Sequence, residues 1–146
     1  MNIIEAVREL LMQFPKISEV VGEVHIDFTD PSPTSYGLSS TDDSLISTDI
    51  LGEQLRQHSF MLYTTYGSMN DYERLSNSSV LTELGLWLSQ QKNIAVETVA
   101  DNVTYSGYIT KIIAGSGMLI AVPQENEFEG VQYQLQIIAE YTAGSD

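Results

Sequence analysis

The chain has 146 residues, 42% of them hydrophobic, which is typical of a single folded domain with its own core and excludes disorder of the whole chain. Twenty acidic residues against six basic ones give a net charge of −14, and six scattered cations do not form the basic patch that binds nucleic acid or an anionic membrane. The chain has no cysteine, which excludes disulfides, thiol catalysis and thiolate metal sites and is typical of a reducing cytoplasm.

The N-terminal segment predicts an amphipathic helix that ends at Pro15. Its apolar residues recur at helical spacing: Ile3, Ile4, Val7, Leu10, Leu11 and Phe14. Early acidic residues and the lack of a basic leader argue against a signal peptide, and no apolar run has the length of a membrane span. We therefore expect a soluble protein that is made and kept inside the cell.

The next segments predict a strand followed by a long loop. Residues 24–28 alternate between apolar and polar, as in a strand with one buried face. Residues 30–50 are rich in Pro, Ser, Thr and Asp and predict a loop, with room for a short strand around 45–47. A loop of this length in a compact domain is either functional or disordered, and we favour a functional role.

The middle of the chain predicts an interior strand and then helix. Residues 56–66 alternate with apolar side chains on both faces, as in a strand with neighbours on both sides. Residues 68–75 and 80–91 have helical spacing, and the Ser76-Asn77-Ser78-Ser79 stretch divides them. We expect the second of these two helical pieces to be the more regular.

The C-terminal third predicts β-structure. Residues 108–114 and 118–122 flank Gly115-Ser116-Gly117 and predict a hairpin, an acidic loop covers 123–130, and residues 131–140 alternate as one long strand. Taken together, the chain predicts a single α+β domain, 1–146, with a largely antiparallel or mixed sheet and two main helical regions packed on it.

No group of residues in the sequence matches a catalytic or metal-binding motif. The Gly-Ser-Gly turn lacks the Lys-Ser/Thr pair of a phosphate loop, and the serines include no G-x-S-x-G elbow that would support a Ser-His-Asp triad. His25 and His58 have no metal-pair spacing, and a solvated or hydrogen-bonded His25 beside Asp27 is the favoured interpretation. The aspartates of 27–49 match no EF-hand, which leaves a loosely held cation at a subunit contact as a minor alternative. We therefore predict no catalytic, cofactor-binding or metal-binding residues, no cofactor and no enzyme activity.

Four stretches, which together cover most of the chain, resemble the phage tail-terminator family, the minor tail proteins of the lambda U-protein type found in prophages of Gram-positive bacteria. They are the helix of 1–15, the strand of 24–28 followed by 33–38, the segment 51–60, and the pair formed by 87–91 and the closing 133–141. The segment 51–60 is similar to a family pattern of the form "dG-stlrqfxF". Two departures concern contacts rather than the fold: 75–81 replaces an Asn-x-x-x-Ser-Gly-Phe stretch, and the acidic loop of 124–130 is more charged.

The resemblance implies a structural virion protein that caps the tail tube as a hexameric ring, stops tube polymerisation and joins the tail to the head connector. Its partners would be copies of itself, the tail-tube protein and the head–tail connector or completion protein. DNA would pass through the lumen without specific binding, and no membrane is involved. The implied location is the virion tail or neck, after synthesis in the host bacterial cytoplasm.

We hypothesise that the subunit and partner interface draws on the long loop and the acidic loop. The residues are Tyr36, Leu38, Asp42, Asp43, Leu45, Ile46, Glu125, Glu127, Phe128 and Glu129. Three alternatives stay open: another neck or tail protein such as an adaptor or tube subunit, an acidic inhibitor that mimics DNA, and a small enzyme.

Overall fold

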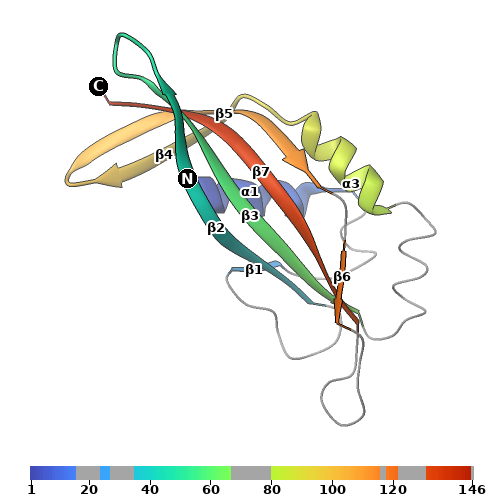
Figure 1. Ribbon diagram of the computed structural model, residues 1–146. Helices are drawn as coiled ribbons and strands as arrows, with labels where there is room; N and C mark the ends of the chain where they lie inside the picture. The colour runs from blue at the N-terminus through green and yellow to red at the C-terminus, as the bar shows by residue number, and fades with distance from the viewer. Residues whose placement is uncertain (16–23, 27–34, 67–79, 116–117, 122–130, 146) are drawn as a thin grey trace.

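The computed structural model describes residues 1–15, 24–26, 35–66, 80–115, 118–121 and 131–145. These residues form a long twisted sheet that carries helices, which confirms the α+β class (Figure 1). In chain order the elements are α1 (Ile3–Gln13), β1 (Val24–Ile26), β2 (Ser35–Thr48), β3 (Gln54–Tyr66), α3 (Val80–Ser89), β4 (Ile94–Ala100), β5 (Val103–Ala114), β6 (Met118–Ala121) and β7 (Val131–Ser145).

The sheet is built around its last strand. The strand order is β1-β2-β3-β7-β5-β4, and β6 also pairs with β7. Among the described strands, β1 pairs with β2 in parallel and the other pairings are antiparallel. The predicted interior strand is confirmed, because β3 lies between β2 and β7.

Helix α1 follows the prediction closely. It begins at a capping box in which the Asn2 side chain accepts the Glu5 amide at 2.9 Å and the Glu5 carboxylate accepts the Asn2 amide at 3.2 Å. It ends before Pro15, which disfavours helical backbone at the residue ahead of it. The helix contacts β4 and β1, while α3 contacts β5.

The predicted loop of residues 30–50 is wrong over most of its length. Residues 35–48 form β2, which pairs with β3 from Ser35 opposite Thr65 to Thr48 opposite Gln54. Composition misled here because a strand with a well-paired neighbour receives its backbone hydrogen bonds from that neighbour and tolerates Ser, Thr and Asp on an exposed face. The connecting turn covers only 49–53, and residues 30–34 lie outside the described residues.

The predicted hairpin between 108–114 and 118–122 is also wrong. Strands β5 and β6 do not pair with each other; both pair with the same edge of β7, Ala114 opposite Ile137 and Met118 opposite Gln134. The Gly115 amide still donates to the Gln136 carbonyl at 2.8 Å, so the chain interrupts its pairing there and resumes in the same direction. Glycine suits such an interruption as well as it suits a turn.

Strand β4 was not predicted from the sequence. This strand forms a hairpin with β5 through Asp101 and Asn102, whose φ values of 51° and 64° are both positive. Two consecutive positive φ values are the requirement of a two-residue type I′ turn, and Asn and Asp meet it at low cost.

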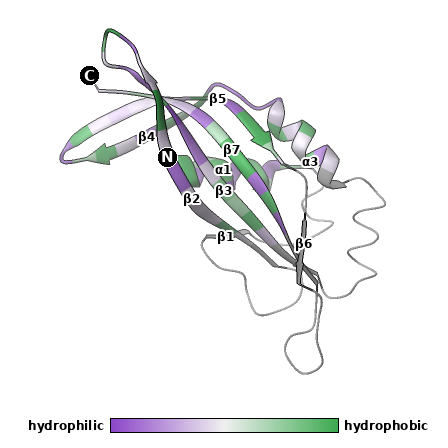
Figure 2. Cartoon of the chain, in the orientation of Figure 1, coloured by the Kyte–Doolittle hydropathy of each residue, from purple (hydrophilic) through white to green (hydrophobic). Residues whose placement is uncertain are grey.

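The core lies on one face of the sheet, in rows that cross the strands. Leu38, Leu62 and Leu135 form one such row, and the next row places Phe60 opposite Ile137. All of these side chains are buried with the apolar face of α1 and with Leu84 and Leu88 of α3 in a single cluster. Figure 2 shows this apolar stretch along the middle of β3 and β7. The hairpins β2–β3 and β4–β5 extend beyond it (Figure 1).

Candidate functional site

A β-bulge places a polar cluster at the end of the core. Alternation would put Ser40 and Asp43 on opposite faces of β2, but the pairing with β3 shifts by one residue between Ser40 and Asp42. The extra residue brings Asp43 onto the core face, directly opposite His58. We define the Asp43 cluster as Ser40, Asp43, Arg56, His58 and Tyr141, contributed by β2, β3 and β7.

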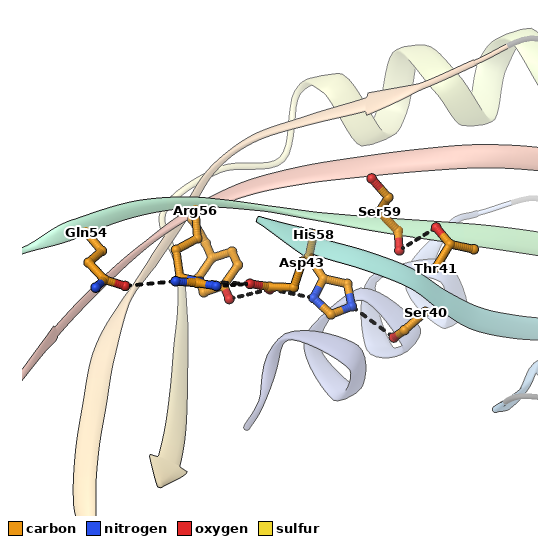
Figure 3. Close-up of polar contacts among 8 residues, drawn as sticks. Ser40, Thr41, Asp43, Gln54, Arg56, His58 and Ser59 are labelled. Carbon is orange, nitrogen blue, oxygen red and sulfur yellow. Dashed lines mark hydrogen bonds and ion pairs between the residues drawn. The ribbon is translucent and has the colours of Figure 1, made fainter. Parts of the chain in front are cut away.

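The Asp43 carboxylate is the centre of this cluster (Figure 3). Its Oδ1 accepts Arg56 Nε at 2.8 Å and Nη2 at 2.7 Å. Its Oδ2 accepts the Tyr141 hydroxyl at 2.6 Å and lies 2.7 Å from His58 Nδ1. Arg56 also donates to Gln54 of the same strand at 3.0 Å. Through its bonds to Arg56, His58 and Tyr141, the Asp43 carboxylate of β2 joins β2 to β3 and β7.

His58 continues the chain of contacts to Ser40. The imidazole is only 9% exposed, and its ring lies against Phe60 with centroids 4.5 Å apart. With the proton on Nδ1 facing Asp43, Nε2 is free to accept the Ser40 hydroxyl, 2.9 Å away.

The electrostatics of the cluster follow from these contacts. Burial by itself raises the pKa of Asp43, but hydrogen bonds from Tyr141, His58 and Arg56 more than offset it, so the pKa lies below its ordinary value. Burial, followed by the neighbouring Asp43 carboxylate, raises the pKa of Tyr141 to about 12. Hydrogen bonding to Asp43 raises the pKa of Arg56. At neutral pH the cluster therefore holds an ionised Asp43 and Arg56 and a neutral Tyr141.

A cavity of about 520 Å³ lies against the cluster. The start of α1 and the β4–β5 hairpin supply a more apolar wall, and Asp43, Arg56, His58 and Tyr141 supply a polar one. Ser40 is not one of the described residues that line this cavity.

The order Ser40–His58–Asp43 is the hydrogen-bond order of an acyl-transfer triad. No such triad was predicted from the sequence, because the serines lack an elbow motif and the bulge that brings these three residues together has no recognisable sequence pattern. However, Ser40, which would supply the hydroxyl, is not among the described residues that line the adjacent cavity. The Asp43 carboxylate, in contrast, joins three strands at the point where the apolar core ends. We therefore interpret the Asp43 cluster first as a set of contacts that stabilises the packing of the β2–β3 hairpin, the part of β2 and β3 beyond the core, against β7.

The turn between β2 and β3 presents the most exposed apolar side chains of the described residues. We define the hairpin tip as residues 49–53. Asp49 Oδ1 accepts the amides of Leu51 and Glu53, each at 2.9 Å, and Gly52 adopts a φ of 88°. This turn leaves the Ile50 side chain fully exposed and Leu51 90% exposed.

The predicted interface residues separate into five groups. Leu38 is completely buried in the core, so its assignment to a subunit interface is wrong; alternation along β2 points it inward. Asp43 belongs to the polar cluster. Asp42, Leu45 and Ile46 are exposed on β2, in a strand rather than in a loop. Tyr36 pairs through its backbone with Thr64, and residues 125–129 lie outside the described residues.

The described residues hold no group of three or more His, Asp or Glu side chains that could bind a metal ion. Of the aspartates considered for a cation, Asp43 and Asp49 are engaged by donors from the protein, and Asp27 and Asp30 lie outside the described residues. His25 is in β1, as predicted for its backbone. Within the described part of the chain, no helix has both the length and the apolar character needed to cross a membrane.

Comparison with known proteins gives no match, either to a protein-family model or to a curated protein sequence.

Proposed function

We propose that this chain is a structural subunit of a phage tail, a terminator that assembles as a ring on the tail tube and joins it to the head connector. The observation that carries the proposal is the set of exposed apolar side chains on the two hairpins that extend beyond the core. On β2–β3 they are Leu45, Ile46, Ile50 and Leu51, and on β4–β5 they are Val99, Val103, Tyr105 and Tyr108.

Such side chains favour assembly. Exposed apolar surface is worth about 25 cal/mol per Å² when a partner covers it, and larger patches of it mark interaction surfaces. Leu51 and Tyr108 line one hollow of about 500 Å³ between the hairpin tip and the β4–β5 hairpin, so the two hairpins share a surface. Figure 2 shows hydrophobic residues near the ends of both hairpins.

The braced geometry supports the same function. A ring whose subunits must meet at a fixed angle needs rigid contact elements, here the β2–β3 hairpin. The Asp43 cluster joins β2, β3 and β7 at the base of the β2–β3 hairpin, where the apolar core no longer holds the strands together. Rigid contact elements also lose less conformational entropy on association.

The charge suits a channel for DNA. A ring of six copies would carry −84, six times the −14 of one chain, so DNA in its lumen would meet like charge and would not adhere. The same charge opposes assembly, which leaves apolar contacts, or basic residues of the tail-tube protein and the connector, to hold the ring in place. The protein would be made in the bacterial cytoplasm and would end in the virion tail or neck.

The proposal is tested by mass and shape. The purified chain is measured by light scattering and negative-stain microscopy, alone and with a phage tail-tube protein. A terminator forms single closed rings, or single caps on the ends of tubes. Long stacks of the chain alone would point to a tube subunit instead, and a particle that stays monomeric with and without tube protein would refute the proposal.

The Ser40–His58–Asp43 order favours a second candidate function, hydrolysis of an ester. Ser40 Oγ would bond to the acyl carbon while its proton passes through His58 Nε2 to the departing alcohol, and water would release the acid by the reverse route. Incubation with a fluorophosphonate probe, followed by mass spectrometry, tests it. Labelling of Ser40 that disappears in His58→Ala, with no labelling of the neighbouring Ser39, would support an enzyme. An unlabelled Ser40 would refute it.

A further inference from the structure

We propose that neighbouring copies are joined when the hairpin tip of one copy seats in an apolar groove between α1 and α3 of the next. This inference rests on the proposed ring function and names the two surfaces that would make the ring.

The hairpin tip has the properties of a preformed anchor. Its two large apolar side chains, Ile50 and Leu51, contact solvent rather than the rest of the described chain. The turn is nevertheless well ordered by hydrogen bonds: the Asp49 carboxylate accepts two backbone amides, the Asp49 amide donates to the Glu53 carbonyl at 2.9 Å, and the Gly52 amide donates to the Asp49 carbonyl at 3.1 Å. An apolar pair held outward by a fixed turn binds a partner without first having to be ordered.

The groove offers matching chemistry. It has a volume of about 280 Å³ and is lined mainly by apolar atoms of Phe14, Leu86 and Trp87, with Glu83 and Gln90 beside them. Phe14 and Trp87 both line it and pack on each other, with ring centroids 5.6 Å apart and planes at 58°. Leu86 stands at its side and is 60% exposed, although it lies in a helix whose Leu84 and Leu88 are buried.

The positions of the two surfaces favour a ring. In Figure 1 the hairpin tip lies at the upper left end of the molecule and α3 lies at the right. A contact between two different surfaces of the chain is head-to-tail, which generates a closed ring or a filament. The hollow beside Leu51 and Tyr108 lies at the same end as the tip, so its use would pair two tips and stop at a dimer. The cavity against the Asp43 cluster presents polar groups that are already paired with one another.

Charge also favours an apolar contact between copies. Each copy carries −14, and Asp49 and Glu53 on the tip would approach Glu83 beside the groove. Among the described residues, neither the tip nor the groove lining includes a Lys or Arg, so burial of Ile50 and Leu51 is the attraction that these residues supply. Added salt screens the repulsion, and assembly should therefore strengthen between low and physiological ionic strength.

Disulfide trapping tests the contact directly, because the chain has no cysteine of its own. The double variant Leu51→Cys/Leu86→Cys, oxidised under conditions in which the wild type assembles, should give a ladder of covalent oligomers up to the full ring. Each single variant should give no ladder. The matched control Val99→Cys/Leu86→Cys places its first thiol on the other hairpin, at another exposed apolar residue, and should also give none.

A second experiment uses loss of the apolar side chains. Ile50→Ser/Leu51→Ser and Leu86→Ser each change exposed side chains, so both proteins should fold and have the mass of a single chain, 16.2 kDa. Mixed together, they should form a one-to-one dimer and nothing larger, because the mixture has one intact tip and one intact groove for each pair.

The outcomes separate this inference from the function on which it rests. If the wild type forms rings but the serine variants form them as well and the Leu51–Leu86 thiols do not link, the inference is wrong and the ring function stands. If Leu51→Cys alone links efficiently, two tips meet and the groove assignment is wrong. If the wild type assembles neither alone nor with tail-tube protein, the proposed function itself fails.

Discussion

Replacement of Asp43 by Asn tests whether the Asp43 cluster braces the fold. The carboxylate accepts Arg56 at Oδ1 and both Tyr141 and His58 at Oδ2, whereas the amide has the same size but accepts at one atom only. The Asn oxygen therefore keeps either the Arg56 contact or the contacts of Tyr141 and His58. These two side chains are 7% and 9% exposed, and an unsatisfied donor at that depth costs about 1–3 kcal/mol. The Arg56 pair is about a quarter exposed, and its loss costs only about 0.2–1 kcal/mol. The expected loss of unfolding free energy is therefore about 1–3 kcal/mol, which for a chain of this size lowers the Tm by roughly 3–10 °C.

Urea unfolding measures this loss. The chain has one tryptophan, Trp87, which packs on Phe14, so its fluorescence reports on the core away from the mutated site. The matched control is Asp42→Asn, the same chemical change at the adjacent exposed carboxylate, which should alter the unfolding free energy by no more than about 0.5 kcal/mol. If the slope of the unfolding free energy against urea concentration is the same for both variants, they unfold between comparable folded and unfolded states.

The reasoning fails if Asp43→Asn and Asp42→Asn lie within about 0.5 kcal/mol of each other. That result would mean that water, rather than the protein, satisfies His58 and Tyr141 when the carboxylate is lost, and that the cluster does not stabilise the β2–β3 hairpin.

Four further outcomes follow from the structure. Because the pKa of Asp43 is lowered in the folded state, its stabilisation is complete above the ordinary value of 3.8 and is lost as the pH falls through the lowered pKa; the difference between wild type and Asp43→Asn in urea should shrink below pH 3.8. Because the pKa of Tyr141 is raised from 10.0 to about 12, its stabilisation is complete below pH 10 and is lost as the pH rises towards 12, and Tyr141→Phe should flatten this alkaline loss. Gly107→Ala should cost about 3 kcal/mol or more in thermal unfolding, since the added Cβ would collide with the backbone of β7, whereas Gly85→Ala in α3 meets only ordinary contacts and should gain up to about 1 kcal/mol. Asn102→Gly should raise stability by up to about 1 kcal/mol, because glycine adopts the positive φ of the β4–β5 turn without strain, and a lower Tm would contradict that turn geometry.

Local periodicity was enough to predict the elements that alternate or repeat strongly. Helix α1 has an uninterrupted apolar face, a capping box and a proline at its end, and each of these signals acts within a few residues. Strands β3 and β7 alternate over long stretches, so their existence and the interior place of β3 could be predicted as well.

Strand β2 could not be predicted in the same way, since its backbone hydrogen bonds come from β3 and its composition is that of a loop. Polar residues such as Ser40 and Asp43 give no local signal for extended structure; the partner strand supplies it. For β6 the strand was predicted but its partner was wrong, because Gly115 marks an interruption of the pairing with β7 that looks like a hairpin turn in the sequence.

The candidate site was even less accessible to sequence. Asp43 lies 15 positions from His58 and 98 from Tyr141 in the chain, and the three meet only through strand pairing. A one-residue bulge decides that Asp43 faces inward while Leu45 and Ile46 remain exposed. The hairpin tip could have been inferred had β2 been recognised, because a turn between two long strands would then have carried Ile50 and Leu51.

Composition and short-range periodicity are properties of the chain alone, and they were enough to predict the acidic charge, the first helix and the α+β class. Which polar side chains of the described residues converge, and which apolar ones are left uncovered, followed from the pairing of the strands. Those outcomes depend on register, and register is set by partners distant in sequence: a shift of one residue moves each side chain of a strand to the opposite face.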